Sequence, residues 1–333
     1  MAPKVVVIVL NWNGVHFLRD CLGALTRQTY VDKEVVLVDN GSSDGSLALV
    51  QAEFAGVRLL RNQRNLGFAA ANNQAIAATQ SEFVALLNND TQVEPDWLAQ
   101  LVGALESDPR LGSCASQMLF AQRPGIINSA GIALDRAGIA WDRWGGRSAQ
   151  DAPAEPGEVF GPCAGAALYR RALFADVGGF DEDFFAYLED VDLAWRARLR
   201  GWGCRYVPQA KVLHCHSGTS KEGSPFKSFL LGRNKLWTIV KNYPVPEVWR
   251  YLPAIGAYDL GSVQYSALLR GDLSPARGRL AALAGVPRML RKRRAIQARR
   301  TVTSSDLLRL MEPLARPDRV ASRYRHLGQL IRE

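Results

Sequence analysis

The stretch ALLNNDTQVEPDWL, residues 85–98, decides the fold expected for this chain. An apolar run that begins at Phe83 ends abruptly in three polar residues, Asn88, Asn89 and Asp90. A buried strand that stops in this way places its polar side chains at the carboxyl edge of a sheet, where ligands bind in open α/β sheets. An Asp at that edge can hold a hard divalent cation, whereas the plainer interpretation is a strand followed by an Asx turn.

Three units of similar design precede this stretch. Apolar runs occupy residues 4–11, 34–38 and 57–62, and each is followed by a polar loop and then a helical pattern. Strands that alternate with helices predict right-handed βαβ units and a mostly parallel central sheet. The expected fold class is therefore α/β.

The loop after the first strand argues against a dinucleotide-binding enzyme. A Rossmann domain has a GxGxxG motif there, because its glycines bring a pyrophosphate close to the amino terminus of a helix. This chain instead has NWNGVHF at residues 11–17. The sequence therefore does not favour hydride transfer.

Two acids mark a second candidate site. The segment EDVDLAWRARLRG has a helical pattern, and Glu189 and Asp190 fall in its first turn, where the helix dipole favours anions. Capping by acids explains that location. It does not explain the apolar rim that precedes them, which consists of Phe184, Phe185, Tyr187 and Leu188.

Two histidines end the last expected strand, at residues 204–216. His214 and His216 are two residues apart, so their side chains lie on the same face of the strand. A pair of histidines at a strand end is compatible with a metal site or with a structural role.

Composition limits the remaining possibilities. At 333 residues and 47% hydrophobic, the chain can bury the core of one large domain or of two unequal ones. No apolar run reaches the roughly 18 residues expected of a spanning helix. The five cysteines form no CxxC pair, so neither a disulfide framework nor a zinc knuckle is indicated, and a reduced, cytosolic protein is expected.

Positive charge is concentrated towards the carboxyl terminus. Residues 270–333 contain 16 Lys and Arg against 5 Asp and Glu, whereas the preceding residues contain 25 against 27. From residue 226 onward the pattern is helical, with no strand signal. The expected organisation is an α/β domain at residues 1–222 followed by a basic α-helical extension at residues 223–333.

Five motifs follow one another along the α/β region: NWNG, VDNGSSDGS, NLGFAAANNQAI, LLNND and LEDVDLAWR. In this order and at this spacing they resemble glycosyltransferase family 2, and most of all its bacterial rhamnosyltransferase-like branch. The resemblance covers residues 4 to about 220. It implies the GT-A fold of nucleotide-diphospho-sugar transferases, inversion at the anomeric carbon and a divalent cation, Mg²⁺ or Mn²⁺.

The resemblance implies a donor site made of residues from three motifs. Asn11 and Asn13 match the loop beside the base and ribose of the donor. Asp39 matches the acid that accepts from the imide N–H of a uracil or thymine ring. Asn65 and Gly67 match the loop that closes over the nucleotide.

The resemblance also implies a metal site, from which this chain departs in part. Asn88, Asn89 and Asp90 match the DxD motif, but the first two positions are Asn, so only Asp90 offers a carboxylate. His214 matches a histidine that often completes the metal site, with His216 as its substitute. Amide, phosphate and water oxygens can fill the remaining positions of the shell, so metal affinity without donor is expected to be weak.

The general base implied by the resemblance is Asp190, with Glu189 beside it and Arg196 in the helix behind. An inverting transferase needs one base and no covalent nucleophile, because a single displacement joins the acceptor hydroxyl to the sugar. The expected donor is dTDP-rhamnose or a UDP-sugar, and the expected acceptor is a cell-surface glycan or a lipid-linked saccharide.

Two other functions remain open at this point. A non-catalytic nucleotide-sugar binding protein is one, because the metal motif holds a single carboxylate. A nucleotidyltransferase is the other, although it would need a glycine-rich loop with Lys or Arg after the first strand, and NWNG is not such a loop.

The basic region predicts attachment to an anionic membrane surface rather than to nucleic acid. Family members of this kind commonly act on lipid-linked acceptors, and basic side chains near apolar ones suit a membrane interface. The expected localisation is cytoplasmic, on the inner face of the cell membrane. The basic cluster comprises Arg288, Arg291, Lys292, Arg293, Arg294, Arg299 and Arg300.

Overall fold

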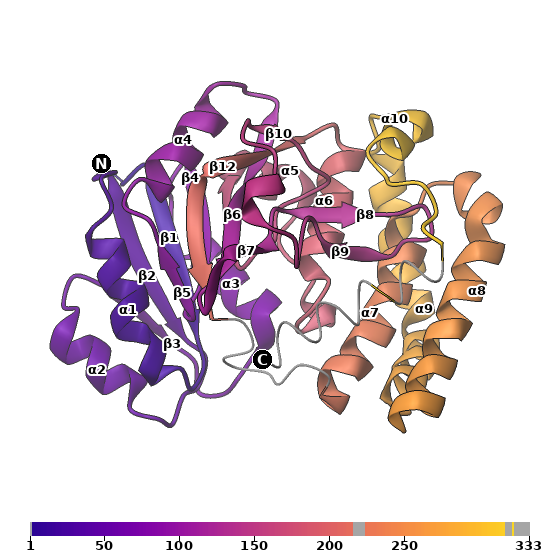
Figure 1. The fold of residues 1–333 in the computed structure, drawn as a ribbon, viewed down its shortest axis with the longest axis horizontal. Coiled ribbons are helices and arrows are strands. Elements are labelled where there is room, and N and C mark those ends of the chain that lie inside the picture. Colours follow the sequence, from indigo (N-terminus) through magenta and orange to yellow (C-terminus); the bar gives the residue numbers. More distant parts are fainter. Residues whose placement is uncertain (1, 216–223, 317–321, 323–333) are drawn as a thin grey trace.

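The computed structural model describes residues 2–215, 224–316 and 322. Its centre is a ten-stranded mixed sheet (Figure 1). Eight strands lie in the order β10 (Gly157–Glu158), β12 (Gly203–His214), β6 (Leu111–Phe120), β11 (Ala166–Arg170), β4 (Phe83–Asn88), β1 (Val5–Asn11), β2 (Lys33–Asp39) and β3 (Arg58–Arg61). In addition, β5 (Thr91–Val93) pairs with β12, and β7 (Arg123–Ser129) pairs with β6. A small second sheet consists of β8 (Ile132–Leu134) and β9 (Ala140–Asp142).

The half of the sheet around β1 is parallel and gathers polar residues at one edge. β1 reads VVVIVLN and is buried almost throughout, as expected of a central strand that packs on both faces. It pairs with β2 and β4, so that Asn11 lies opposite Asp39 and Leu10 lies opposite Asn88. The carboxyl ends of three strands therefore meet at the edge where the sequence predicts a ligand.

The other half contains a strand that the sequence pattern did not reveal. The pattern predicts a short helix from Leu168, but Leu168–Arg170 end β11, and α5 (Arg171–Val177) begins only after them. β11 runs antiparallel between β4 and β6, with Ala167 opposite Leu86 on one side and Ala115 on the other. Pairing on both sides of a buried strand outweighs the helix propensity of its Ala and Leu residues.

Helices cover both faces of the sheet (Figure 1). α1 (Val15–Thr26), α2 (Ser46–Glu53) and α4 (Trp97–Glu106) share a buried cluster with the side chains that β1 directs to one face, among them Val7. α3 (Gly67–Ala77), α5 and α6 (Glu189–Leu199) share a second cluster with the opposite face, among them Ile8. The predicted α/β architecture is confirmed.

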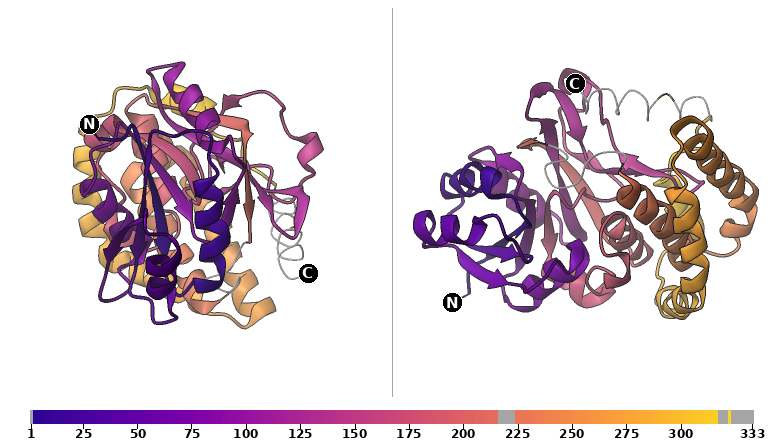
Figure 2. Two further views of the ribbon diagram at one scale, coloured as in Figure 1. Left: turned by 90° about the vertical axis from the view of Figure 1, so that its left-hand side faces the viewer. Right: turned by 90° about the horizontal axis from the view of Figure 1, so that it is seen from below.

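The helical pattern after residue 226 is also confirmed. The helices are α7 (Pro225–Asn242), α8 (Glu247–Arg270), α9 (Ser274–Ala298) and α10 (Ser304–Arg309), at the far end of the molecule from α2 (Figure 2). A buried cluster joins Trp195 of α6 to Tyr243, just after α7, and to Ile255 of α8, so this region shares a core with the α/β part. Among the described residues, no helix combines the length and apolarity needed to cross a bilayer.

Candidate active site

A buried network of amides ties together the three strand ends at the polar edge. Asn11, which is fully buried, donates from Nδ2 to Oδ1 of Asp39 at 3.2 Å and to Oγ of Ser42 at 3.1 Å. Its own Oδ1 accepts from Nδ2 of Asn89 at 2.7 Å. The second oxygen of Asp39 accepts from the backbone N–H of Ser42 at 3.1 Å. The ends of β1, β2 and β4 are thereby held in one fixed arrangement.

The loop after β1 is held against the loop after β2. Asn13 has φ of 51°, and its backbone N–H donates to Oγ of Ser42 while its Oδ1 accepts from the N–H of Ser43. Asn tolerates this left-handed conformation better than most residues. Asn11, Asn13 and Asp39, predicted to form one donor site, therefore lie together in the structure.

The third donor motif is tied to the same edge by Asn40, which the sequence analysis did not single out. Nδ2 of Asn40 donates to Oδ1 of Asn65 at 2.9 Å, and the N–H of Gly67 donates to that same oxygen at 2.8 Å. Gly67 has φ of 83°, and a Cβ there would lie 2.5 Å from the carbonyl oxygen of Phe185. Gly67 is therefore required where this loop approaches the loop that precedes Glu189.

Asp90 and His214 lie in contact, as the metal-site prediction requires. β5 pairs with β12 so that Thr91 lies opposite His214, and this register brings Nε2 of His214 to 3.2 Å from Oδ1 of Asp90. Both side chains are largely buried. On its other side, Nδ1 of His214 lies 2.8 Å from Oδ1 of Asn128, at the end of β7. His216 lies outside the described residues.

The donor set at Asp90 and His214 fits a divalent cation in part. One carboxylate and one imidazole face each other, and Asn128 can hold the imidazole in the tautomer that leaves Nε2 open, as hydrogen-bonded partners of metal-bound histidines do. Within the described ranges, no three His, Cys, Asp or Glu side chains come close enough to form a metal site. A cation held here would therefore need oxygens from the donor diphosphate and water.

Asp190 and Glu189 begin α6 in different environments. Asp190 is half-buried, and its oxygens accept from the N–H groups of Ala164 at 3.3 Å and Val191 at 2.8 Å. Burial raises the pKa of the Asp190 carboxyl to about 6, and the charge of Asp142 acts in the same direction, against those hydrogen bonds. Glu189 is buried, and burial with the nearby charge of Asp190 holds its pKa well above the usual range. The Asp190 carboxyl, with a pKa of about 6, is therefore mostly ionised at neutral pH, whereas burial favours the protonated form of Glu189.

A short backbone link connects the Asp190 end of the site to the Asn88 end. The N–H of Ala164 donates to Asp190, and the carbonyl of the next residue, Gly165, accepts from the N–H of Asn88 at 2.9 Å. Both contacts depend on the start of β11, the strand that the sequence pattern did not reveal. Residues 164 and 165 therefore connect Asp190 to the end of β4.

The structure adds two details to the region around Asp190. Phe184, the first residue of the expected apolar rim, is fully buried and packs edge-on against Trp237 at 6.1 Å. Arg196 binds Asp192 at 2.9 Å and donates to backbone carbonyls of the α5–α6 connection, so it stabilises the helix from behind. Phe185, Tyr187 and Leu188 remain partly exposed before the acids.

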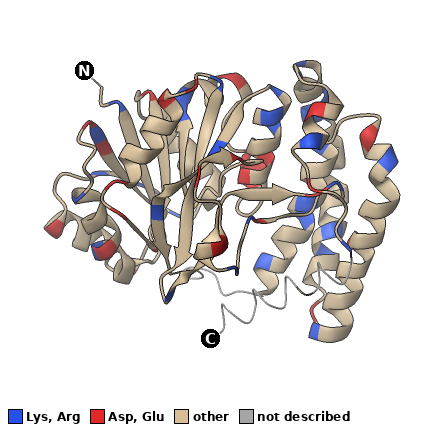
Figure 3. Ribbon diagram, turned by 45° about the horizontal axis from the view of Figure 1, so that its top comes forward, with Lys and Arg blue, Asp and Glu red and all other residues tan. Residues whose placement is uncertain are grey.

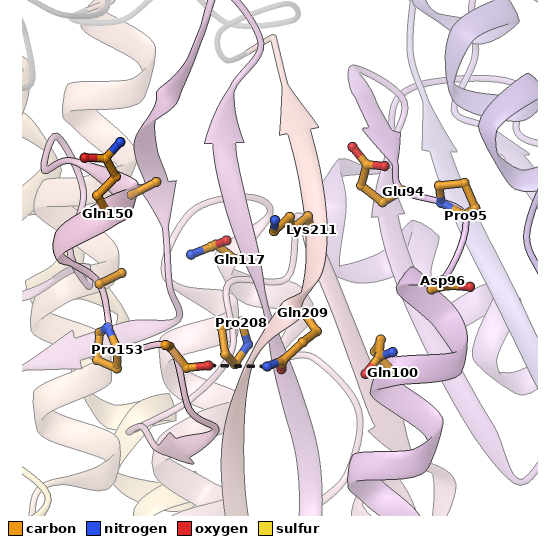
Figure 4. Close-up of a pocket in the computed structure, with 13 residues that line it drawn as sticks. Glu94, Pro95, Asp96, Gln100, Gln117, Gln150, Pro153, Pro208, Gln209 and Lys211 are labelled. Carbon is orange, nitrogen blue, oxygen red and sulfur yellow. Dashed lines mark hydrogen bonds between the residues drawn. The ribbon is translucent and has the colours of Figure 1, made fainter.

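A cavity of about 640 Å³ lies elsewhere, between α4 and the strands β6 and β12 (Figure 4). Its lining includes Glu94, Gln100, Gln117, Gln150 and Lys211. None of the predicted site residues lines it, so it is separate from the site described above.

Comparison with known proteins agrees with this geometry. Residues 5–178 match the family model described as glycosyl transferase family 2. The chain belongs to this family. The chain is 32% identical over 241 residues to N-acetylglucosaminyl-diphospho-decaprenol L-rhamnosyltransferase of Mycobacterium tuberculosis, which covers 64% of this chain and 76% of that protein. It is 28% identical to the O-antigen biosynthesis protein RfbC of Myxococcus xanthus over 66% of this chain and 18% of that protein.

Solved structures of glycosyltransferases show the same fold. GalNAc-T7, in complex with UDP, GalNAc and Mn²⁺, matches with a TM-score of 0.60 and 17% identity over 75% of this chain and 50% of that one. Mannosyltransferase PcManGT from Pyrobaculum calidifontis, in complex with GDP-Man and Mn²⁺, matches with a TM-score of 0.51 and 19% identity. The match covers 93% of this chain and 79% of that one. The predicted GT-A fold is confirmed. The prediction of a family 2 glycosyltransferase similar to rhamnosyltransferases is confirmed as well.

Proposed function

We propose that this family 2 glycosyltransferase is an inverting, cation-dependent enzyme. Its donor is dTDP-rhamnose or a UDP-sugar, and its acceptor is a hydroxyl of a cell-surface glycan or of a lipid-linked saccharide. The relative from Mycobacterium tuberculosis, named as an L-rhamnosyltransferase for a diphospho-decaprenol acceptor, supports that choice. Two structural neighbours, each solved with Mn²⁺ and a nucleotide or nucleotide sugar, support a cation.

The observation that carries inversion is the contrast between Asp190 and Glu189. Asp190 is the partly exposed carboxylate and has a pKa of about 6, which suits a general base near neutral pH. Glu189 is buried, and its raised pKa favours the neutral form, which suits neither a base nor a nucleophile. One base without a second ionised carboxylate beside it matches a single displacement.

The proposed reaction moves one proton and one glycosyl group. Asp190 accepts the proton of the acceptor hydroxyl while that oxygen bonds to the anomeric carbon. The bond from that carbon to the diphosphate breaks, and the nucleoside diphosphate leaves with its electron pair. Asp39 and the amides of Asn11 and Asn13 would hold the nucleotide, and Asp90 and His214 would hold the divalent cation. When bound, such a cation neutralises charge on the leaving diphosphate.

The direct test uses the purified chain with dTDP-rhamnose and UDP-sugars, a lipid-linked acceptor, and Mn²⁺, Mg²⁺ or EDTA. We expect cation-dependent release of nucleoside diphosphate and a product with inverted anomeric configuration. Retained configuration contradicts the proposed single displacement. Donor binding without transfer would instead identify a binding protein. Formation of nucleoside triphosphate and sugar 1-phosphate when pyrophosphate is added would identify a nucleotidyltransferase.

The fall of kcat/KM at acidic pH should reflect protonation of Asp190. Because the base must be ionised, kcat/KM should rise with pH and level off above about 6, the raised pKa of this carboxyl. The matched control is Glu189→Gln, in which this acidic limb of the pH profile should persist because a neutral carboxyl and an amide carry the same charge. If the acidic limb disappears in Glu189→Gln, the titrating group is Glu189, and the assignment to Asp190 is wrong.

For the membrane, we propose that the outer faces of α8 and α9 lie on an anionic lipid surface. Between Arg250 and Arg270, α8 has a single charged residue, Asp259, so most of this helix is tan in Figure 3. Asp259 pairs with Lys235 and Arg279. Anionic lipid is the partner that complements the exposed basic residues beside this apolar face. The exposed apolar residues are Trp249, Leu252, Leu260, Leu268, Leu269, Leu273, Leu280, Leu283 and Leu290, and the exposed basic ones include Arg270, Arg277, Arg291 and Arg294.

Part of the basic cluster has a different use. Arg288 and Lys292 bind Asp183 at 2.8 and 2.7 Å, and Arg299 binds Asp176 at 3.0 Å. These three side chains attach α9 and the residue after it to the α/β part of the molecule. Removing α9 would therefore damage the fold as well as any membrane surface, and substitutions are the cleaner probe.

Replacing Arg291 and Arg294 with Gln should weaken binding to anionic vesicles. Each basic side chain near such a surface contributes roughly 1 kcal/mol, so the pair should lower the partition constant about 30-fold. Co-sedimentation with vesicles of increasing anionic lipid content, at low and high salt, measures this. The matched control is Arg19→Gln, an exposed Arg of α1 paired with Glu53. Binding that ignores salt and lipid charge would contradict the proposal.

A further inference from the structure

The loop that leads into Asp190 has an unfavourable backbone conformation. Phe185, Tyr187 and Leu188 have φ values of 66°, 68° and 65°, and they are three of five non-glycine residues with positive φ among those described. Bulky residues adopt this region only where their surroundings hold them there. Leu188 is the N-cap of α6, so this loop sets the direction in which Asp190 enters the site.

The surroundings that hold the loop belong to α7. Asn234, which is fully buried, directs its Nδ2 at the carbonyl oxygens of Phe184, Ala186 and Tyr187, at 3.1, 2.9 and 2.7 Å. Its neighbour Arg233 donates from Nη2 to the carbonyls of Asp183 and Phe184, at 3.1 and 2.9 Å. Four carbonyl groups of a five-residue stretch therefore accept from two adjacent side chains of one helix.

The remaining carbonyl of this stretch is held from the opposite side. The oxygen of Phe185 accepts from the N–H groups of Phe68 at 2.6 Å and Ala69 at 3.2 Å, at the start of α3. All the carbonyls from residue 183 to residue 187 thus accept from α3 or α7. Neither helix contains a proposed base or metal ligand, so their contribution to Asp190 is the position of this loop.

We infer that Asn234 is a positioning residue for transfer: its amide fixes the loop at residues 184–188 in the conformation that presents Asp190 to the acceptor. The inference rests on the proposed role of Asp190 as the base. It assigns to α7, in the helical carboxyl-terminal region, a part in catalysis that is independent of any membrane. A side chain that only stabilised α7 would affect the folding temperature but not turnover well below it.

The test compares Asn234→Ala and Asn234→Ser with Thr238→Ala. Thr238 is buried one turn further along α7, and its hydroxyl bonds only within the helix, to the carbonyl of Asn234. We expect kcat of Asn234→Ala to fall about 10- to 100-fold, because small displacements of a catalytic group are costly. The donor KM should stay within about twofold, since Asn65 and Gly67 keep their contacts with Asn40. Asn234→Ser, which keeps one donor, should be intermediate, and Thr238→Ala should keep wild-type kcat.

Each outcome decides. Wild-type kcat in Asn234→Ala, or an equal loss in Thr238→Ala at a temperature well below both melting points, overturns the inference. If the Ala variant cannot be purified, a lower kcat with unchanged donor KM in Asn234→Ser supports it, and wild-type kcat in that variant overturns it. If Asp190→Asn is active, Asp190 is not the base. If Asp190→Asn is inactive and Asn234→Ala is fully active, only the role of Asn234 is rejected.

Discussion

Asp190→Asn should abolish sugar transfer and leave donor binding intact. At pH values above 6, the same substitution should raise the melting temperature of the protein. The amide is close in shape to the carboxylate but cannot accept the acceptor proton, so a loss of about 10²-fold or more in turnover is expected. Donor binding should persist because the contacts proposed for the nucleotide, at Asn11, Asn13 and Asp39, lie at or just after the ends of β1 and β2 and not in α6.

The stability effect follows from the raised pKa of Asp190. The folded protein holds this carboxyl at a pKa of about 6, above the ordinary value of 3.8, so folding is opposed wherever the carboxyl must be ionised. That penalty is absent below about pH 4, grows between 4 and 6, and is constant above 6. It amounts to at most about 3 kcal/mol, and Asn removes it.

Thermal unfolding at pH 5 and pH 8, with and without donor, measures both parts of this prediction. The difference in melting temperature between Asp190→Asn and wild type should be larger at pH 8. The matched control is Asp192→Asn, because Asp192 is buried two residues further on but has a lowered pKa, which burial opposes and Lys241 and Arg196 favour. That control should lose stability at pH 8. Wild-type turnover in Asp190→Asn would exclude Asp190 as the base.

The sequence predicts the parallel half of the fold well because the relevant signals are local. Each of β1, β2 and β4 is an apolar run that ends in Asn or Asp, and parallel pairing brings those ends to one edge of the sheet. The proximity of Asn11, Asp39 and Asn89 follows from that register. No knowledge of distant parts of the chain is needed for it.

The sequence pattern fails where tertiary pairing overrides local propensity. Ala166–Arg170 are good helix formers, yet they form β11, because β4 and β6 present unpaired edges on either side. That strand matters for the site, since the N–H of Ala164 just before it binds Asp190. Asn128 and Asn234 were missed for a related reason. Asn128 contacts His214, 86 residues away, and Asn234 contacts a loop about 50 residues away. No motif surrounds either asparagine.

Asn40 could have been found from the sequence. It follows Asp39 directly in VDNGSSDGS, at the end of a strand whose last side chains were already assigned to the site. Its amide bridges the loops after β2 and β3, which no single motif reveals. The different pKa shifts of Glu189 and Asp190 could not have been found in this way. They depend on the burial of each carboxyl, on the charge of Asp190 beside Glu189, and on the backbone hydrogen bonds that Asp190 accepts.

Asp90→Ala should eliminate cation-dependent donor binding, and His214→Ala should reduce it. Asp90 is the one carboxylate of the Asn88–Asp90 motif, so its removal leaves a hard divalent cation with amide and imidazole ligands from this motif and His214. Loss of affinity should exceed about 10²-fold for Asp90→Ala. It should be about 10-fold for His214→Ala, in which Asp90 and the donor phosphates still bind the cation.

Calorimetric titration of a nucleoside diphosphate, with Mn²⁺ or with EDTA, separates cation-dependent affinity from the rest. The free-Mn²⁺ signal in electron paramagnetic resonance gives a second readout that does not depend on turnover. Asp20→Ala is the matched control, because Asp20 is an exposed carboxylate that binds Gln92 of β5, two residues from Asp90. It should leave both readouts unchanged.

The histidines make the prediction specific. Asn128 orients the ring of His214, so Asn128→Ala should produce a smaller loss of Mn²⁺ affinity in the same direction as His214→Ala. A silent His214→Ala with a damaging His216→Ala would move the ligand by two residues and leave Asp90 in place. If neither histidine affects Mn²⁺ binding and the cation dependence persists, the contact between His214 and Asp90 is structural, and the remaining ligands must be oxygens of Asp90, the donor and water.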